Sequence, residues 1–289
     1  MKPVLWRAAD PDGGVHHFTR RPENVCTEVA WATADGRATI HHGDCLDVMR
    51  SMADGSVDVV WTSPPYNQLG SRIPAKGSGC ISNRGFIDNV NRCGYADDMP
   101  EDEYVAFLAR VAEGVANVLR PGGSFFFNHK IRYRDSVPLH PWDMVRAWPG
   151  FSVRQEIVWD RRKSIVFNAR MYAPSDERIY WLVRDGAKHA WNQEAAGLLS
   201  VWNIPANETG IEHPCPTPVE VVAYSLASVA SRDCVVLDPF GGSGTTAVAA
   251  LREGCRAILI EDKAAYVEIA KARVVHAAAQ GNLFHGSVS

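Results

Sequence analysis

The chain has 289 residues, 46% of them hydrophobic, and a formal net charge of −3 at pH 7. This length and apolar content suit one large globular domain and exclude disordered and fibrous classes. The slightly acidic balance excludes a uniformly basic surface, so a nucleic-acid partner would have to bind at a local patch.

The seven cysteines are widely spaced, and the sequence holds no Cys-x-x-Cys pair. This usage is typical of free thiols in a reducing compartment and predicts no metal site. The longest apolar runs are shorter than a membrane span, and the N-terminus lacks the pattern of a signal peptide. We therefore expect a soluble, cytoplasmic protein that contacts no membrane.

The first regular pattern begins near residue 38. Residues 1–37 show no clear periodicity, and we assign them to an N-terminal arm of unknown role. A strand is predicted over residues 38–42, followed by a helix with Leu46 and Met49 at helical spacing and by a buried strand over residues 57–62. This is the strand, helix, strand order of an α/β protein.

A rigid turn follows that strand at Ser63-Pro64-Pro65-Tyr66. Two prolines remove two amide donors and favour an extended Ser63, so neither a helix nor a sheet can continue. The carbonyls of Ser63 and Pro64 therefore have no partners in the sheet. Beside the ring of Tyr66, they could accept hydrogen bonds from a planar group that carries an NH2. The alternative interpretation is a strand-ending turn with an aromatic plug.

Residues 67–98 are rich in asparagine, glycine and arginine and have few apolar anchors. A loop of this length inside a compact domain is usually functional or disordered. Because it starts at the Pro-Pro-Tyr turn, we predict a mobile loop that contacts the substrate, with a merely solvated insertion as the alternative.

The middle of the chain continues the alternation. An amphipathic helix is predicted from Tyr104 to Leu119, and strands are predicted over residues 124–128, 151–160 and 177–183. Residues 185–212 show little pattern, and we assign them to a small lobe.

The last third has the clearest pattern. The predicted elements are a helix over residues 217–228, a strand over 234–237, a helix over 247–253, a strand over 257–260, a helix over 263–280 and a tail over 281–289. Alternating strands and helices predict a mostly parallel sheet with helices on both faces.

A glycine-rich turn joins the strand ending at Leu237 to the next helix. The spacing Gly242-x-Gly244-x-x-Ala247, with Glu261 at the end of the next strand, matches the pattern that binds the adenosine half of a cofactor. Asp238 would repel a pyrophosphate but suits a cationic ammonium group. This argues against a nicotinamide dinucleotide, although an NAD-binding oxidoreductase stays an alternative.

Together the two motifs resemble those of DNA amino-methyltransferases. Asp238-Pro-Phe-x-Gly-x-Gly-Thr is similar to their S-adenosylmethionine loop, and Ser63-Pro-Pro-Tyr66 is similar to their catalytic motif. The order, catalytic motif first, resembles the beta class. The resemblance spans residues 43–271 and implies a circularly permuted, Rossmann-like methyltransferase fold over residues 38–280.

The resemblance also implies roles for matching positions. The catalytic residues would be Ser63, Pro64, Pro65 and Tyr66. The cofactor-binding residues would be Asp44, Cys45, Thr217, Asp238, Phe240, Gly241, Gly242, Ser243, Gly244, Thr245, Glu261 and Asp262. Contacts to double-stranded DNA are assigned to Asn67, Arg72, Lys76, Arg84, Arg161, Arg162, Lys163 and Arg170, with residues 185–212 as a target-recognition lobe.

The implied reaction is methylation of a flipped base in a bacterial or phage-encoded restriction-modification system. Two acceptors of the turn would bind the amino hydrogens, and Tyr66 would stack on the base. Ser63 favours N4 of cytosine, because relatives with Asp at this position usually act on N6 of adenine, which is the alternative. Two alternatives stay open for the function: methylation of RNA or of a small molecule, and a DNA-binding protein of this family without catalytic activity. The protein could also form a homodimer.

Overall fold

The computed structural model describes residues 29–67, 99–134, 137–162, 172–206 and 216–285. The described chain is organised around one nine-stranded sheet. From edge to edge the strands are β1 (Val29–Ala32), β2 (Ala38–His42), β11 (Arg256–Glu261), β10 (Val235–Asp238), β3 (Val57–Thr62), β4 (Leu119–His129), β8 (Asp176–Arg184), β7 (Phe151–Asp160) and β9 (Val201–Asn203).

The central strands β2, β11, β10, β3 and β4 are parallel, as the alternating pattern predicted. The additions around them are mixed, because β1, β8 and β7 pair in antiparallel fashion and β9 is parallel to β7. The sheet is thus parallel where the two motifs lie and mixed outside this central part.

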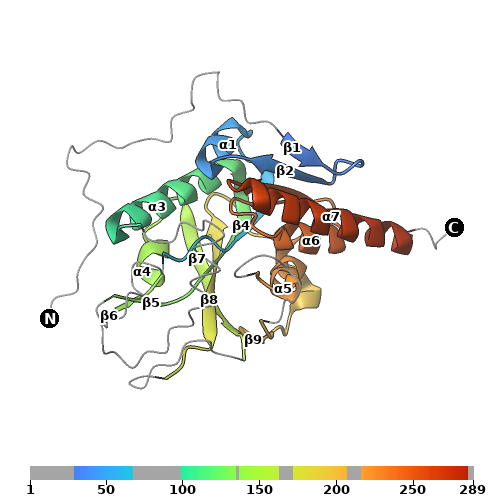
Figure 1. The fold of residues 1–289 in the computed structure, drawn as a ribbon. Coiled ribbons are helices and arrows are strands. Elements are labelled where there is room, and N and C mark those ends of the chain that lie inside the picture. Colours follow the sequence, from blue (N-terminus) through green and yellow to red (C-terminus); the bar gives the residue numbers. More distant parts are fainter. Residues whose placement is uncertain (1–28, 68–98, 135–136, 163–171, 207–215, 286–289) are drawn as a thin grey trace.

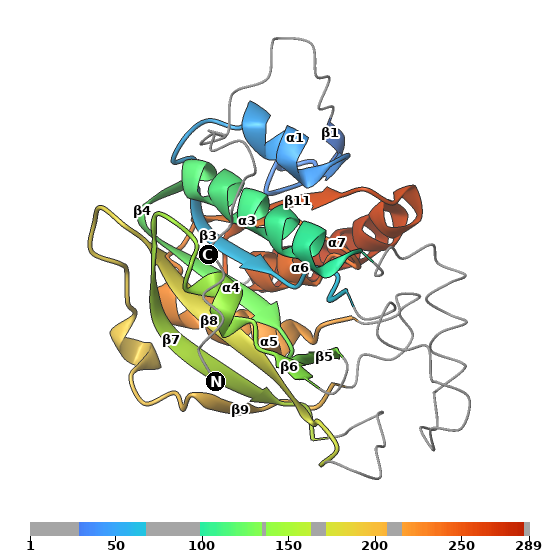
Figure 2. The same cartoon turned by 90° about the vertical axis from the view of Figure 1, so that its left-hand side faces the viewer.

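Helices cover both faces of the sheet (Figure 1). The helices are α1 (Cys45–Ser51), α3 (Glu101–Val118), α4 (Trp142–Val145), α5 (Val219–Val229), α6 (Thr245–Arg252) and α7 (Ala264–His285), with a 3-10 turn η2 at Gln193–Ala195. One apolar cluster packs α5, α6 and α7 on one face, and a second packs α1, α3 and α4 on the other (Figure 2). The result is the three-layer architecture that alternating strands and helices favour.

Four short elements were not predicted or differ from the prediction. The small sheet of β5 (Arg132–Arg134) and β6 (Val137–Leu139) and the helix α4 have too few residues to show a period. β1 belongs to the predicted arm, yet it pairs with β2 and lengthens the sheet.

Two assigned segments also look different in the structure. In the described part of the 185–212 segment, β9 joins the main sheet beside β7 and Trp202 is buried in the core, so these residues extend the sheet. The final helix α7 runs to His285, beyond the predicted end of the domain. No described helix is long and apolar enough to cross a membrane.

Candidate active site

The two motifs meet at the carboxyl ends of two central strands. β3 and β10 are neighbouring parallel strands, so Ser63, which follows β3, and Asp238, the last residue of β10, lie on the same side of the sheet. Thr62 Oγ1 donates a hydrogen bond of 2.7 Å to Asp238 Oδ1 and connects the strand before the turn to the glycine loop. Two segments separated by 176 positions in the sequence therefore form one site.

The proline turn is supported by contacts on its far side. Tyr104 Oη donates to the Pro65 carbonyl at 2.6 Å, and Asn67 Nδ2 donates to the Met99 carbonyl at 2.8 Å. No described residue donates to the carbonyl oxygens of Ser63 and Pro64. The role of these two carbonyls as acceptors for an amino group stays a prediction.

The Tyr66 hydroxyl lies inside a polar network rather than at the end of a free ring. It is 2.6 Å from Ser63 Oγ, 2.8 Å from Asn128 Nδ2 and 2.9 Å from Glu177 Oε2. Asn128 lies at the end of β4 and Glu177 at the start of β8, and sequence reasoning missed both, because neither stands in a recognisable local motif. The register of β4 and β8 brings these two strand ends together.

The Tyr66 ring rests against His129. Their ring centroids are 4.7 Å apart, and Lys130 Nζ lies 5.3 Å from the Tyr66 centroid. His129 is fully buried, and desolvation lowers the pKa of its imidazole well below the ordinary value, with Arg132 acting in the same direction. His129 is therefore a neutral support for the ring at physiological pH.

The glycine loop wraps tightly around the ends of β10 and β11. The Gly241 amide donates to the Ile260 carbonyl at 2.8 Å, and the Gly242 amide donates to Glu261 Oε2 at 2.7 Å. Gly242 and Gly244 have φ angles of 50° and 82°, which L side chains rarely adopt. The loop thus depends on glycine for its backbone as well as for space.

Gly244 gives a direct test of this packing. A Cβ at Gly244 would lie 2.9 Å from Ala270 Cα, so we expect Gly244→Ala to lower the free energy of unfolding by about 2–5 kcal/mol, from left-handed strain plus overpacking. The control is Gly36→Ala, where φ is 68° and nothing lies within 4 Å, with an expected loss of about 1–2 kcal/mol. Denaturant unfolding measures both, and equal losses would contradict the packing argument.

Two loop residues assigned to the cofactor have another visible role. Arg273 of α7 donates through Nη1 to Ser243 Oγ at 2.8 Å and to Thr245 Oγ1 at 2.9 Å. Both side chains are buried. They hold the loop to α7, so their predicted contact with the cofactor would fall to the backbone.

Two carboxyl groups flank the loop. Asp238 accepts from Thr62, Thr246 and the Phe240 amide, and burial raises its pKa to about 7 despite these bonds. Glu261 accepts from the Gly242 and Lys263 amides, and burial raises its pKa to about 7 as well. A ligand that supplies a positive charge or hydroxyl donors would therefore stabilise the ionised form of each acid.

The remaining predicted cofactor residues surround this loop unequally. The Asp44 carboxylate caps α1 by accepting from the Leu46 and Asp47 amides. Cys45 is buried in the core, and desolvation raises the pKa of its thiol, so its side chain packs with apolar neighbours. Phe240 packs edge-on against Phe107, with 6.0 Å between the ring centroids.

Two predicted site residues lie at the margin. Thr217 is half-buried just before α5, and Asp262 is exposed directly after Glu261. Asp262 forms an ion pair with Lys263 at 3.2 Å, and its side chain also interacts with Glu261 and, in addition to burial, helps to raise the pKa of that acid. Among the described residues, no side-chain contact of Thr217 assigns it a chemical role. Their contact with a cofactor stays a prediction.

The predicted DNA contacts divide into three groups. Asn67 is buried against Met99, and Arg161 pairs with Glu177 at 3.1 Å, so both are engaged inside the protein. Arg162 is exposed at the end of β7. Outside the described residues lie Arg72, Lys76, Arg84, Lys163 and Arg170.

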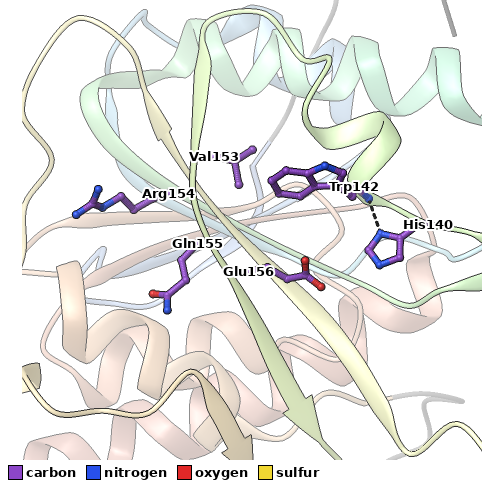
Figure 3. Close-up of a pocket in the computed structure, with 6 residues that line it drawn as sticks. All are labelled: His140, Trp142, Val153, Arg154, Gln155 and Glu156. Atoms are coloured by element: carbon purple, nitrogen blue, oxygen red, sulfur yellow. Dashed lines mark hydrogen bonds between the residues drawn. The ribbon is translucent and has the colours of Figure 1, made fainter. Parts of the chain in front are cut away.

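A separate hollow of about 550 Å³ lies beside β7 and α4 (Figure 3). It is lined by His140, Trp142, Val153, Arg154, Gln155 and Glu156. None of these residues belongs to the turn or the glycine loop. Across the described parts of the chain, no group of three His, Cys, Asp or Glu side chains could hold a metal ion.

Comparison with known proteins agrees with this geometry. The profile of the family N6_N4_Mtase, described as DNA methylase, matches residues 57–272. Type II methyltransferase M.ScaI of Streptomyces caespitosus is 26% identical over 274 residues, which cover 81% of this chain and 80% of M.ScaI. Type II methyltransferase M2.MboI of Moraxella bovis is 24% identical over 253 residues, which cover 83% of this chain and 88% of M2.MboI.

Two solved structures share the fold. The PvuII DNA methyltransferase (cytosine-N4-specific) superposes with a TM-score of 0.67 at 19% identity, over 89% of this chain and 96% of that chain. The putative DNA modification methylase TTHA0409 of Thermus thermophilus, complexed with S-adenosyl-L-methionine, superposes with a TM-score of 0.57 at 25% identity, over 83% of this chain and 95% of that chain.

Proposed function

Since the chain belongs to the DNA methylase family N6_N4_Mtase, it is an S-adenosylmethionine-dependent DNA amino-methyltransferase, and we propose that its target is N4 of cytosine. The fold is the permuted one of the beta class, with the turn after β3 preceding the glycine loop after β10. The observation that carries the choice of base is Ser63 at the head of the turn, where its hydroxyl meets Tyr66 at 2.6 Å. The alternative product is N6-methyladenine.

The residues around the glycine loop fit the cofactor. Asp238 and Glu261 are buried acids at the ends of adjacent strands, which suit an ammonium group and ribose hydroxyls respectively. Gly241 keeps the loop close to β11, since a Cβ there would lie 3.0 Å from Leu259 Cβ. When bound, S-adenosylmethionine supplies a methyl group activated by a sulfonium.

The turn supplies what the base requires. An exocyclic amino nitrogen is a poor nucleophile, because its lone pair is delocalised into the ring. Ser63 Oγ and the Pro64 carbonyl would accept its hydrogens and favour a geometry in which the lone pair is available. The base must leave the duplex to reach this turn, and contact with the Tyr66 ring would offset part of the unstacking cost.

The DNA surface is proposed from what surrounds the turn. Lys130 follows the strand that brings Asn128 to the site, and the exposed Arg162 follows Arg161. Together with the predicted 67–98 loop, they would supply the positive charge that the chain as a whole lacks. The proposed target-recognition segment is residues 185–212, of which β9 extends the sheet beside β7.

Nucleoside analysis tests the choice of base. Duplex DNA is incubated with the protein and S-adenosylmethionine, digested to nucleosides and separated by mass. We expect N4-methylcytosine, and N6-methyladenine as the only product would overturn the assignment to cytosine while leaving the amino-methyltransferase intact.

The raised pKa of Asp238 predicts how stability depends on pH. The unfolded chain ionises this acid near its ordinary pKa of 3.8, whereas the folded chain without cofactor keeps the proton up to about pH 7. The stability contributed by this proton is therefore fully present below pH 3.8 and lost as the pH rises through about 7. We expect Asp238→Asn to flatten the fall in unfolding free energy over this window.

Denaturant titrations from about pH 4 to about pH 8 measure this dependence. Asp143→Asn is the control, since Asp143 is exposed and pairs with Arg146 at 3.5 Å. The same acid predicts that cofactor affinity rises with pH through about 7, because the ionised form attracts the ammonium group. If the unfolding free energy of Asp238→Asn fell with pH as steeply as that of the wild type, the assignment of this pH dependence to Asp238 would be contradicted.

A further inference from the structure

Glu177 lies outside both motifs but at the centre of the polar network. Its side chain is 8% exposed, and its Oε1 accepts from Arg161 Nη1 at 3.1 Å. Its Oε2 accepts from Tyr66 Oη at 2.9 Å and from Asn128 Nδ2 at 3.0 Å. Of the carboxylates in the described residues, Glu177 is the one that these contacts bring to the turn.

The Glu177 carboxylate, ion-paired with Arg161 at 3.1 Å, sets the direction of the hydrogen bonds. A carboxylate only accepts, so Tyr66 spends its single hydroxyl proton on Glu177. The 2.6 Å contact between Ser63 Oγ and Tyr66 Oη must then be donated by Ser63. Ser63 thus has no proton left to give, and its oxygen faces a substrate as an acceptor.

Asn128 strengthens this order. Its amide nitrogen has two hydrogens, and its shorter contacts are to Tyr66 Oη at 2.8 Å and to Glu177 Oε2 at 3.0 Å, against 3.3 Å to Ser63 Oγ. The Asn128 amide therefore donates its hydrogens in the same direction as the two hydroxyls, toward Glu177. Every polarised hydrogen in the network points toward Glu177.

We propose that Glu177 is a positioning residue that makes the site select an amino group and that receives the proton released on methylation, through Tyr66 and Ser63. This inference rests on the proposed function. As the carbon–nitrogen bond forms with the nitrogen lone pair, the bond between the methyl carbon and the sulfonium breaks and leaves its electron pair on the sulfur. The nitrogen becomes cationic and must lose one N–H proton. That proton passes to Ser63 Oγ, the Ser63 proton to Tyr66 Oη, and the Tyr66 proton to Glu177 Oε2, which ends as a neutral acid.

The other groups near the turn do not offer this path. The imidazole of His129 touches the Tyr66 ring, but its nitrogens lie 2.8 Å from Tyr104 Oη and 2.8 Å from the Lys130 carbonyl. Lys130 and Arg161 are cations and have no lone pair that could accept the proton. Asp176 and Arg178, next to Glu177 in β8, pair with each other.

The first test measures the chemical step. In single-turnover assays with duplex DNA, we expect Glu177→Gln to reduce the rate of methyl transfer about 100-fold, with DNA affinity and unfolding midpoint close to wild type. Glu177→Asp, which keeps an acceptor, should recover part of the rate. Asp176→Asn removes the adjacent carboxylate without touching the network, and it should keep the wild-type rate.

The second test needs no cofactor. DNA affinity is compared between a duplex with the target base and one in which a carbonyl oxygen replaces its amino group, such as uracil for cytosine. We expect the wild-type preference for the amino base to shrink about tenfold in Glu177→Gln. The glutamine amide can donate to Tyr66, so the hydrogen bonds can reverse direction and Ser63 can donate to the carbonyl oxygen of the other base. The affinity ratio of the two duplexes is compared between wild type and Glu177→Gln, so differences in base pairing between the duplexes cancel.

The outcomes separate the two proposals. If the wild-type protein methylates no DNA base, the proposed function fails. If it methylates DNA but Glu177→Gln keeps its rate, or loses rate without any change in amino preference, the role of Glu177 is overturned. If Glu177→Gln unfolds, Glu177→Asp and Tyr66→Phe carry the same comparison, and an unchanged preference in both contradicts the inference.

Discussion

Replacing Tyr66 with alanine is expected to lower the single-turnover rate of methyl transfer by about 10³-fold or more, because removal of one preorganised hydrogen-bonding group typically costs about 10²–10³-fold and the ring is lost as well. The substitution removes the hydroxyl that joins Ser63 to Glu177 and the ring that rests on His129. Affinity for S-adenosylmethionine should change less than about twofold, since these partners of Tyr66 lie outside the glycine loop.

Calorimetry with the cofactor and rapid-quench assays with DNA measure the two quantities separately. Tyr133→Ala is the matched control, because Tyr133 is 39% exposed on β5 in the neighbouring hairpin. It should leave both quantities unchanged. A parallel loss of cofactor affinity in Tyr66→Ala would show that the residue maintains the fold of the whole site.

The second large effect is expected at Glu261. Glu261→Ala should weaken S-adenosylmethionine binding about 10–100-fold, the range for loss of a charged hydrogen-bond acceptor. The carboxylate would bind the ribose, and it also receives the Gly242 amide at 2.7 Å and the Lys263 amide at 3.0 Å. The loop therefore loses its anchor as well as its ligand contact.

Two further variants divide these effects. Glu261→Gln keeps an acceptor for the Gly242 amide and should give an intermediate affinity. Glu268→Ala removes an exposed acid of α7 that pairs with Lys271 at 3.5 Å, and it should bind the cofactor normally. Wild-type affinity in Glu261→Ala would refute the ribose assignment.

The sequence predicted the core elements of this fold well. The bounds of the strands over Val57–Thr62 and Phe151–Asp160 were predicted to the residue. Each β-forming run is flanked by residues typical of turns, which mark where the strand begins and ends. Short elements at the edges carry too little local signal, so β5, β6, α4 and β9 were missed. Their positions depend on tertiary pairing, as β9 shows by joining β7.

The site was predictable only in its two motifs. Strand order brings Ser63 and Asp238 together. The sequence placed each motif at the end of a predicted strand, but it did not predict the order of the strands in the sheet. Asn128 and Glu177 could not be found, because their importance comes from cross-strand register, and β4 and β8 place them side by side. For the same reason the ion pair of Arg161 with Glu177 was not predicted, and the contact of Arg161 with DNA stays a prediction.

One measurement tests the central claim that the turn and the glycine loop form a single centre for amino methylation. Duplex DNA treated with the protein and isotopically labelled S-adenosylmethionine is digested, and fragmentation of the labelled nucleoside locates the methyl group. The structure predicts that the label is on an exocyclic amino nitrogen and is lost in Tyr66→Ala. Label on a ring carbon, or no label in DNA, would contradict it.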